Sequence, residues 1–199
     1  RLLRMGRMQL RACVLASVAA AACGSSSGGA VSGGTPGGAF DLADSISSSV
    51  TTSDGAGGSA SSARIVLAST SGLCSDASAT PPIDRKGQRF ITIELRDVDG
   101  ATSTTPTAPG TYTIYPNTGS EPPKSASLET GGFDDTCQQI DEDSASAQSG
   151  TVTLTAITGG AFSGTFDVTL NPGGHLTGSF DPDPCAQLAA ATDVEHACR

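Results

Sequence analysis

The segment Thr151-Val-Thr-Leu-Thr-Ala-Ile157 alternates polar and apolar residues, and two similar segments follow it, Phe162-Ser-Gly-Thr-Phe-Asp-Val-Thr-Leu170 and Leu176-Thr-Gly-Ser-Phe180. A period of two places the apolar side chains of a strand on one face and the polar side chains on the other. The joining sequences, Gly159-Gly160 and Asn171-Pro-Gly-Gly174, are short and rich in turn-forming residues. The three segments therefore predict an antiparallel meander with one buried face.

A short repeat links the second and third of these segments. Ser163-Gly-Thr-Phe-Asp167 is followed by Thr177-Gly-Ser-Phe-Asp181, so each phenylalanine has a glycine two residues before it. Because a glycine has no side chain, it leaves room on the inner face of the sheet for a ring from the neighbouring strand. We expect each phenylalanine to use the space above the other strand's glycine.

Earlier parts of the chain carry the same period. The segment Phe90–Arg96 places Ile91, Ile93 and Leu95 on one face, and only Ala186–Cys198 is expected to form a helical turn. Further strands are expected at Ala39–Ile46, Arg64–Ser69, Thr111–Tyr115 and Ser125–Glu129, with a long loop over Ser47–Ser62. The chain is therefore predicted to be all-β, an antiparallel β-sandwich of about seven to nine strands with long Ser/Gly loops. A closed β-barrel is the alternative.

The first residues have a different character. A head with four arginines precedes an apolar run over Ala12–Ala22, which ends in Ala20-Ala21-Ala22 before Cys23. As a helix this run would reach about 16 Å, roughly half of the hydrocarbon core of a bilayer, so it is too short to span one. Its charge order is that of a secretory signal.

The same residues resemble the export signal of bacterial lipoproteins, whose cysteine receives fatty acyl chains such as palmitate and becomes the new N-terminus. The resemblance implies a signal peptide over residues 1–22 and lipidation at Cys23. Residues 23–38 are then a flexible Ser/Gly tether, and residues 39–199 are the folded domain. That domain resembles small β-rich lipoproteins only in general character.

The resemblance also implies a location. Gly24, and not aspartate, follows the cysteine, which implies a lipid anchor in the outer membrane of the cell envelope. Ala20 stands where lipoprotein signals usually carry leucine, so cleavage by the ordinary signal peptidase, giving a secreted or periplasmic protein, is the alternative.

The net charge of the chain limits the classes of partner that we expect it to bind. It has 20 acidic and 11 basic residues and a net charge of −9. Loss of residues 1–22 would remove four arginines and leave −13. Nucleic-acid phosphates require lysine and arginine, so we expect no nucleic-acid partner, and membrane contact only through the anchor.

Four cysteines lie in the expected folded domain: Cys74, Cys137, Cys185 and Cys198. An even number in an exported chain predicts two disulfides. Of the three possible connectivities, Cys74–Cys137 with Cys185–Cys198 is favoured, because the second pair closes a short loop. A metal site is disfavoured, since the chain has no Cys-x-x-Cys pair and its two histidines have no ligand-like spacing.

Catalytic candidates are few. His175 could act with Asp167 or Asp181 as an acid–base pair, but a histidine beside a turn is usually solvated and no activated nucleophile is near in sequence. Gly24-Ser-Ser-Ser-Gly28 matches the nucleophile elbow of hydrolases, yet it lies in the predicted tether and not on a strand-to-helix turn. His196 lies near the chain end. We therefore expect no catalytic residue, no cofactor and no enzyme, with an envelope hydrolase as an alternative.

Acidic side chains gather around one cysteine. Hard oxygen ligands on a loop pinned by a disulfide suit calcium, although no EF-hand spacing occurs and clustered acids are usually solvated. The candidate ligands are Asp134, Asp135, Asp141, Glu142 and Asp143. The expected function is a structural role in the envelope, or binding of an envelope protein or glycan through the loops 97–109 and 133–143. A calcium-dependent adhesion module is a further alternative.

Overall fold

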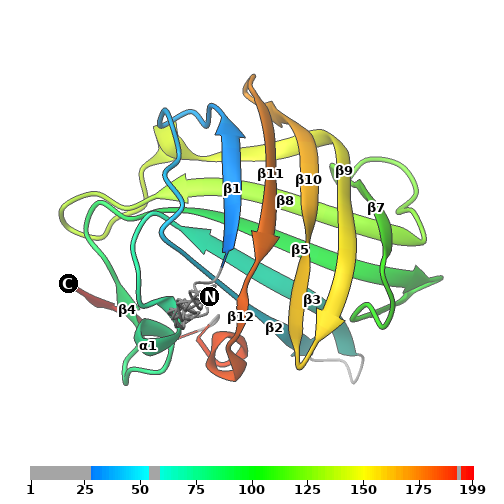
Figure 1. Ribbon diagram of the computed structural model, residues 1–199, viewed down its shortest axis with the longest axis horizontal. Coiled ribbons are helices and arrows are strands. Elements are labelled where there is room, and N and C mark those ends of the chain that lie inside the picture. The colour runs from blue at the N-terminus through cyan, green and yellow to red at the C-terminus, as the bar shows by residue number, and fades with distance from the viewer. Residues whose placement is uncertain (1–27, 54–58, 192–193) are drawn as a thin grey trace, which may run out of the picture.

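The computed structural model describes residues 28–53, 59–191 and 194–199, and these residues are mostly in strands (Figure 1). The strands are β1 Gly28–Gly33, β2 Asp44–Ser53, β3 Ser59–Ala68, β4 Ile83–Asp84, β5 Arg89–Asp99, β6 Thr102–Thr104, β7 Gly110–Ile114, β8 Lys124–Gly132, β9 Ala145–Thr158, β10 Ala161–Asn171, β11 His175–Asp181, β12 Asp183–Pro184 and β13 Ala197–Cys198. The helical elements are α1 Leu73–Ala77, η1 Asp141–Asp143 and η2 Ala186–Ala189. The predicted all-β class is confirmed.

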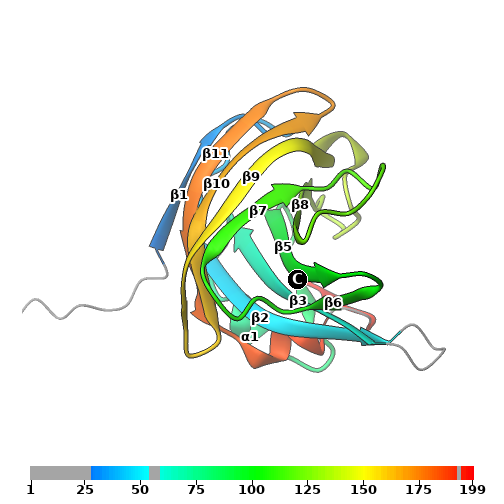
Figure 2. The ribbon, with the colours of Figure 1, turned by 90° about the vertical axis from the view of Figure 1, so that its right-hand side faces the viewer.

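Eleven of the strands form one sheet with the order β1-β11-β10-β9-β7-β8-β5-β3-β2-β12, with β6 paired to β5. Most neighbours are antiparallel, whereas β7–β8 and β12–β2 are parallel. The sheet is curled into a half-barrel, so that β1, β11, β10 and β9 face β8, β5, β3 and β2 (Figures 1 and 2). One continuous sheet thus supplies two facing layers, an arrangement between a sandwich and a barrel. No helix in the described ranges is long and apolar enough to cross a membrane.

The main core lies on the inner face of this curled sheet. Ile91, Ile93 and Leu95 of β5 are fully buried there, as the alternating pattern predicts. The predicted meander is β9–β10–β11, and its inner face adds Leu154 and Leu176 to the same cluster. Burial of these side chains removes apolar surface from water, which is the dominant favourable term in folding.

The repeat in the meander has the predicted effect. Gly164 pairs with Phe180, and Phe166 pairs with Gly178, across the β10–β11 register. Each ring occupies the space where a side chain on the opposite glycine would stand. The two glycines therefore let both rings lie against the sheet in the main core.

The prediction that residues 23–38 form a flexible tether is wrong for residues 28–33. Gly28–Gly33 is strand β1, which pairs with β11 along its whole length. The outer edge of β11 offers backbone groups that need partners, and Val31 packs against the main core. The predicted start of the folded domain at residue 39 is therefore too late. Cys23 and residues 24–27 lie outside the described residues.

The predicted loop over Ser47–Ser62 is also wrong, because most of it belongs to the β2–β3 hairpin. Ser45 and Ser47 are fully buried. The small side chain of Ser47 allows a close approach of β10, where the Phe162 amide donates to Ser47 Oγ at 3.3 Å. Serine-rich sequence here forms a strand because tertiary pairing overrides weak β-propensity.

All four cysteines of the folded domain are paired, as predicted, but the favoured connectivity is wrong. The disulfides are Cys74–Cys185 and Cys137–Cys198, with Cα–Cα distances of 5.7 and 5.6 Å. Short sequence separation is a misleading guide here, because the fold brings α1 beside η2 and places β13 beside β4. The predicted turn within Ala186–Cys198 exists as η2.

These short elements cover part of the outer face of the sheet. We call α1, β4, η2 and β13 together the cover. It packs on the outer face of β2 and β3 through a second core of Ile46, Ala68, Leu73, Cys185 and Leu188. One disulfide joins Cys74 of α1 to Cys185, directly before η2, and the other joins Cys198 of β13 to Cys137 in the connection from β8 to β9.

Candidate functional site

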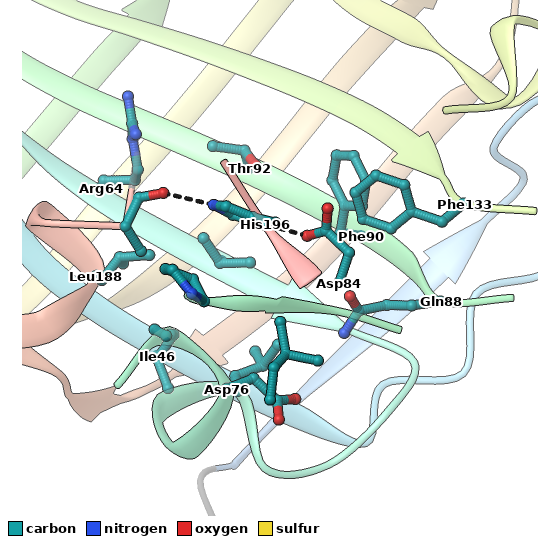
Figure 3. Close-up of a pocket in the computed structure, with 16 residues that line it drawn as sticks. Ile46, Arg64, Asp76, Asp84, Gln88, Phe90, Thr92, Phe133, Leu188 and His196 are labelled. Carbon is teal, nitrogen blue, oxygen red and sulfur yellow. Dashed lines mark hydrogen bonds and ion pairs between the residues drawn. The ribbon is translucent and has the colours of Figure 1, made fainter. Parts of the chain in front are cut away.

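A cavity of about 250 Å³ lies between the cover and the sheet (Figure 3). Its floor is the outer face of β3 and β5, with Val66, Phe90 and Thr92. Leu73 and Leu188 of the cover line the opposite side. We call this space the cover cavity. Ligand pockets in proteins are typically concave and mostly apolar with a few polar groups, and the cover cavity has this character.

Two aromatic rings form one end of the cover cavity. The ring centroids of Phe90 and Phe133 are 5.3 Å apart, and the ring planes are inclined by 43°. Phe90 lies over Gly131, its partner in the β5–β8 register. A side chain on Gly131 would stand 2.6 Å from the Phe90 ring. The glycine therefore fixes where this wall of the cavity can lie.

His196 fastens the chain end to the cover. Its Nδ1 is 2.7 Å from Asp84 Oδ1, and its Nε2 is 2.7 Å from the Ala191 carbonyl oxygen (Figure 3). Because both partners are acceptors, both ring nitrogens donate only when the ring is protonated. Burial lowers the pKa of His196, but the hydrogen bonds to Asp84 and Ala191 and the Asp84 charge outweigh burial and raise it.

An ion pair holds the other side of the cover. Arg85 donates from Nε to Asp76 Oδ2 at 2.5 Å and from its terminal nitrogen to Oδ1 at 2.9 Å. Asp76 is 7% exposed, so this two-point pair satisfies a nearly buried carboxylate. The hydrogen bond to Asp76 raises the pKa of Arg85 above its ordinary value. Asp44 Oδ2 accepts from the Gly72 and Leu73 amides at 2.7 and 2.9 Å, which fixes the start of α1 to β2.

A polar hollow of about 330 Å³ adjoins the cover cavity along the same face of the sheet. Arg64 and Thr92 line both spaces. Arg64 Nε donates to Glu94 Oε1 at 2.8 Å, so the two side chains neutralise each other. Ser127 and Glu129 of β8 complete the hollow. The outer face of the sheet is therefore apolar in the cover cavity and polar in the adjoining hollow.

The arrangement is suited to binding. The cover cavity offers apolar walls, and the histidine that lines it has both ring nitrogens engaged with the protein. A general base needs a nitrogen free to accept a proton from substrate, so His196 does not fill that role in this state.

The histidine considered as a catalytic candidate lies elsewhere. Of its two predicted partners, Asp167 is the one in contact: His175 Nε2 is 2.7 Å from Asp167 Oδ1. The other, Asp181, instead accepts a hydrogen bond from Ser163 Oγ at 2.6 Å. The His175 and Asp167 side chains are 62% and 70% exposed on the outer face of β10 and β11. Within the described ranges, no hydroxyl or thiol side chain is hydrogen-bonded to His175.

The candidate calcium ligands lie in the connection from β8 to β9. Asp134 Oδ1 accepts from the Thr136 amide and hydroxyl, both at 2.7 Å, and from the Gln138 amide at 2.9 Å. These bonds, with the Thr136 hydroxyl first, lower the pKa of Asp134. Asp141, Glu142 and Asp143 form η1. Across the part of the chain that the structure describes, no three His, Cys, Asp or Glu side chains are placed to hold one ion.

Sequence reasoning missed the cover cavity. Phe90 and Thr92 stand on the alternating face opposite the predicted core, so the alternation assigns them to solvent. Phe133 opens one of the two loops expected to bind a partner. The sequence signals are Phe90 and Val66, apolar residues on the face opposite the core positions of their strands.

Comparison of the chain with protein-family models, curated proteins and solved structures finds no match.

Proposed function

We propose that this chain is a lipid-anchored lipoprotein of the cell envelope whose folded domain binds a small apolar group in the cover cavity. The export pattern ending at Cys23 supports the anchor. The two disulfides are consistent with an oxidising compartment. The binding surface is then the space beneath the cover, and not the loops 97–109 and 133–143 alone.

One observation carries the binding function. The cover cavity remains open although disulfides, an ion pair and a half-buried histidine all fasten the cover around it. Protein interiors are close-packed, and voids larger than a water molecule are few. A space of this size beneath a fastened apolar cover is therefore suited to a ligand.

The proposal is tested with phenethyl alcohol, a neutral probe with one ring. We expect saturable NMR shifts of the Phe90, Thr92 and Leu188 amides on titration. Ala77 lines the cavity and is half-buried, so Ala77→Leu should fill the space and abolish the shifts. Ala186 is an exposed residue of η2, and Ala186→Leu is the matched control that keeps binding. Absence of saturable shifts in the wild type, or binding that survives Ala77→Leu, contradicts the proposal.

A further inference from the structure

One carboxylate beside the cover cavity has no cationic partner among the described residues. Around the cavity and the polar hollow, Asp76 pairs with Arg85, Asp84 with His196 and Glu94 with Arg64. Glu129 is exposed, and within the described ranges it takes part in no salt bridge. The carboxylate of Glu129 is therefore free to meet a cation from outside.

Glu129 is close to the cavity wall. It stands directly opposite Thr92 in the antiparallel β5–β8 register, and Thr92 lines both the cover cavity and the polar hollow. Directly opposed residues have Cα atoms about 4.5–5.5 Å apart, and their side chains lie on the same face. A ligand leaving the cavity past Thr92 therefore meets the Glu129 carboxylate.

The volume of the cover cavity limits what it holds. Pockets for drug-sized ligands measure roughly 300–1,000 Å³, whereas the cover cavity measures about 250 Å³. It accommodates one ring or a short alkyl chain, and the remainder of a larger ligand must lie outside. The polar hollow, of about 330 Å³, is the adjoining space.

We propose that the cover cavity and the polar hollow together form a site for an amphipathic cation, with its apolar group beneath the cover and its ammonium group at Glu129. The inference rests on the proposed function, since it presumes that the cavity is occupied. An anionic ligand is disfavoured, because Arg64 is already neutralised by Glu94 and the remaining charge is negative. The net charge of −9 acts in the same direction.

The test uses three matched probes: phenethylamine, which is cationic at neutral pH, neutral phenethyl alcohol and anionic phenylacetate. We expect the amine to bind about two- to fivefold more tightly than the alcohol, as for an exposed ion pair. Phenylacetate should bind most weakly. The preference for the amine should shrink as salt is added, because salt screens exposed charges.

Substitution of Glu129 separates the charge effect from the cavity itself. Glu129→Gln should abolish the preference for the amine and leave the affinity for the alcohol unchanged. Glu142 is also exposed, in η1, and Glu142→Gln changes the net charge equally, so it should leave the preference intact.

The two proposals fail in different ways. If no probe binds to the wild type, the cavity is not a binding site and both proposals fall. If the alcohol binds but the amine binds no better, or if the amine preference survives Glu129→Gln, only the cation site is overturned.

Discussion

The ring of Phe180 lies over Gly164, its partner across the β10–β11 register. A Cβ atom on Gly164 would stand 2.8 Å from Phe180 Cζ and would also collide with the Thr153 carbonyl oxygen of β9. Gly164 thus allows the Phe180 ring of β11 and the Thr153 backbone of β9 to approach it at the same time.

Gly164→Ala should therefore destabilise the domain, by about 1–3 kcal/mol, because overpacking forces side chains off their rotamers and shifts the backbone. Urea unfolding followed by circular dichroism measures the loss. A Cβ atom on Gly34 would meet no described atom within 4 Å, and the φ angle of Gly34 is not in the left-handed region. Gly34→Ala is therefore the matched control and should change stability little. Equal stability of the two variants would show that Phe180 and β9 accommodate the methyl group.

The disulfide connectivity gives a second prediction. Mass spectrometry of the unreduced protein after proteolysis should find Cys74 linked to Cys185 and Cys137 linked to Cys198. The sequence separations are 111 and 61 residues, so each crosslink should contribute about 4–5 kcal/mol by constraining the unfolded chain. A peptide joining Cys185 to Cys198 would contradict the placement of the cover.

Removal of each disulfide in turn distinguishes the effect of the crosslink on the unfolded chain from the effect of buried cysteine contacts in the folded protein. Cys185 is 2% exposed within the second core, whereas Cys198 is exposed. Cys74→Ala with Cys185→Ala should therefore lower the melting temperature more than Cys137→Ala with Cys198→Ala, since only the first pair also removes buried apolar contacts. A larger loss for the second pair would mean that the chain end, and not the second core, limits the stability of the cover.

The strands with regular alternation could be predicted from sequence, and those without it could not. Ile91, Ile93 and Leu95 mark β5 because one face of that strand is wholly apolar. In contrast, Gly28–Gly33 carries little local preference and becomes β1 through pairing with β11, almost 150 residues away by sequence number. Such pairing depends on the fold of the rest of the chain.

The candidate site is hidden from sequence reasoning for a related reason. Thr92 is polar and lies opposite the main core, so its alternation indicates solvent. Its neighbours across the cavity are Leu73 and Leu188. These residues belong to two segments that are far apart in sequence and that the sheet brings together. Disulfide pairing follows from the same placement, which is why the short loop between Cys185 and Cys198 is a poor guide.

The proposed anchor gives a fourth prediction. Since β1 begins at Gly28, an acylated Cys23 would be joined to the sheet by a chain that spans at most about 18 Å when fully extended. The native protein should fractionate with membranes and have an intact mass increased by fatty acyl groups. Cys23→Ser should release it without unfolding it, because Cys23 is in neither disulfide. An unacylated mass for the membrane-associated wild type would contradict the anchor.

The pH dependence of the cover is the fifth prediction. The pKa of His196 is raised above its ordinary value of 6.5 in the folded protein, so the folded state binds the proton more tightly than the unfolded chain does. The stabilising contribution of protonated His196 is complete below about pH 6.5 and is lost as the pH rises through the raised pKa. Protonation maintains both hydrogen bonds, to Asp84 and to the Ala191 carbonyl. The cover should therefore loosen as the pH rises through the raised pKa of His196.

The free energy of unfolding, measured by urea titration from pH 5.5 to 8.5, checks this prediction by comparison of variants. His196→Asn should flatten the fall in stability that accompanies the rise of pH above about 6.5, because the titrating group is gone. His175→Asn removes the other histidine, which lies outside the cover on β11, and should keep the fall. Amide exchange of Ala197 and Arg199, which donate to Pro82 and Asp84, should speed up over the same pH range beyond the intrinsic rate. If His196→Asn retains the wild-type profile, the bond between His196 and Asp84 does not fasten the cover.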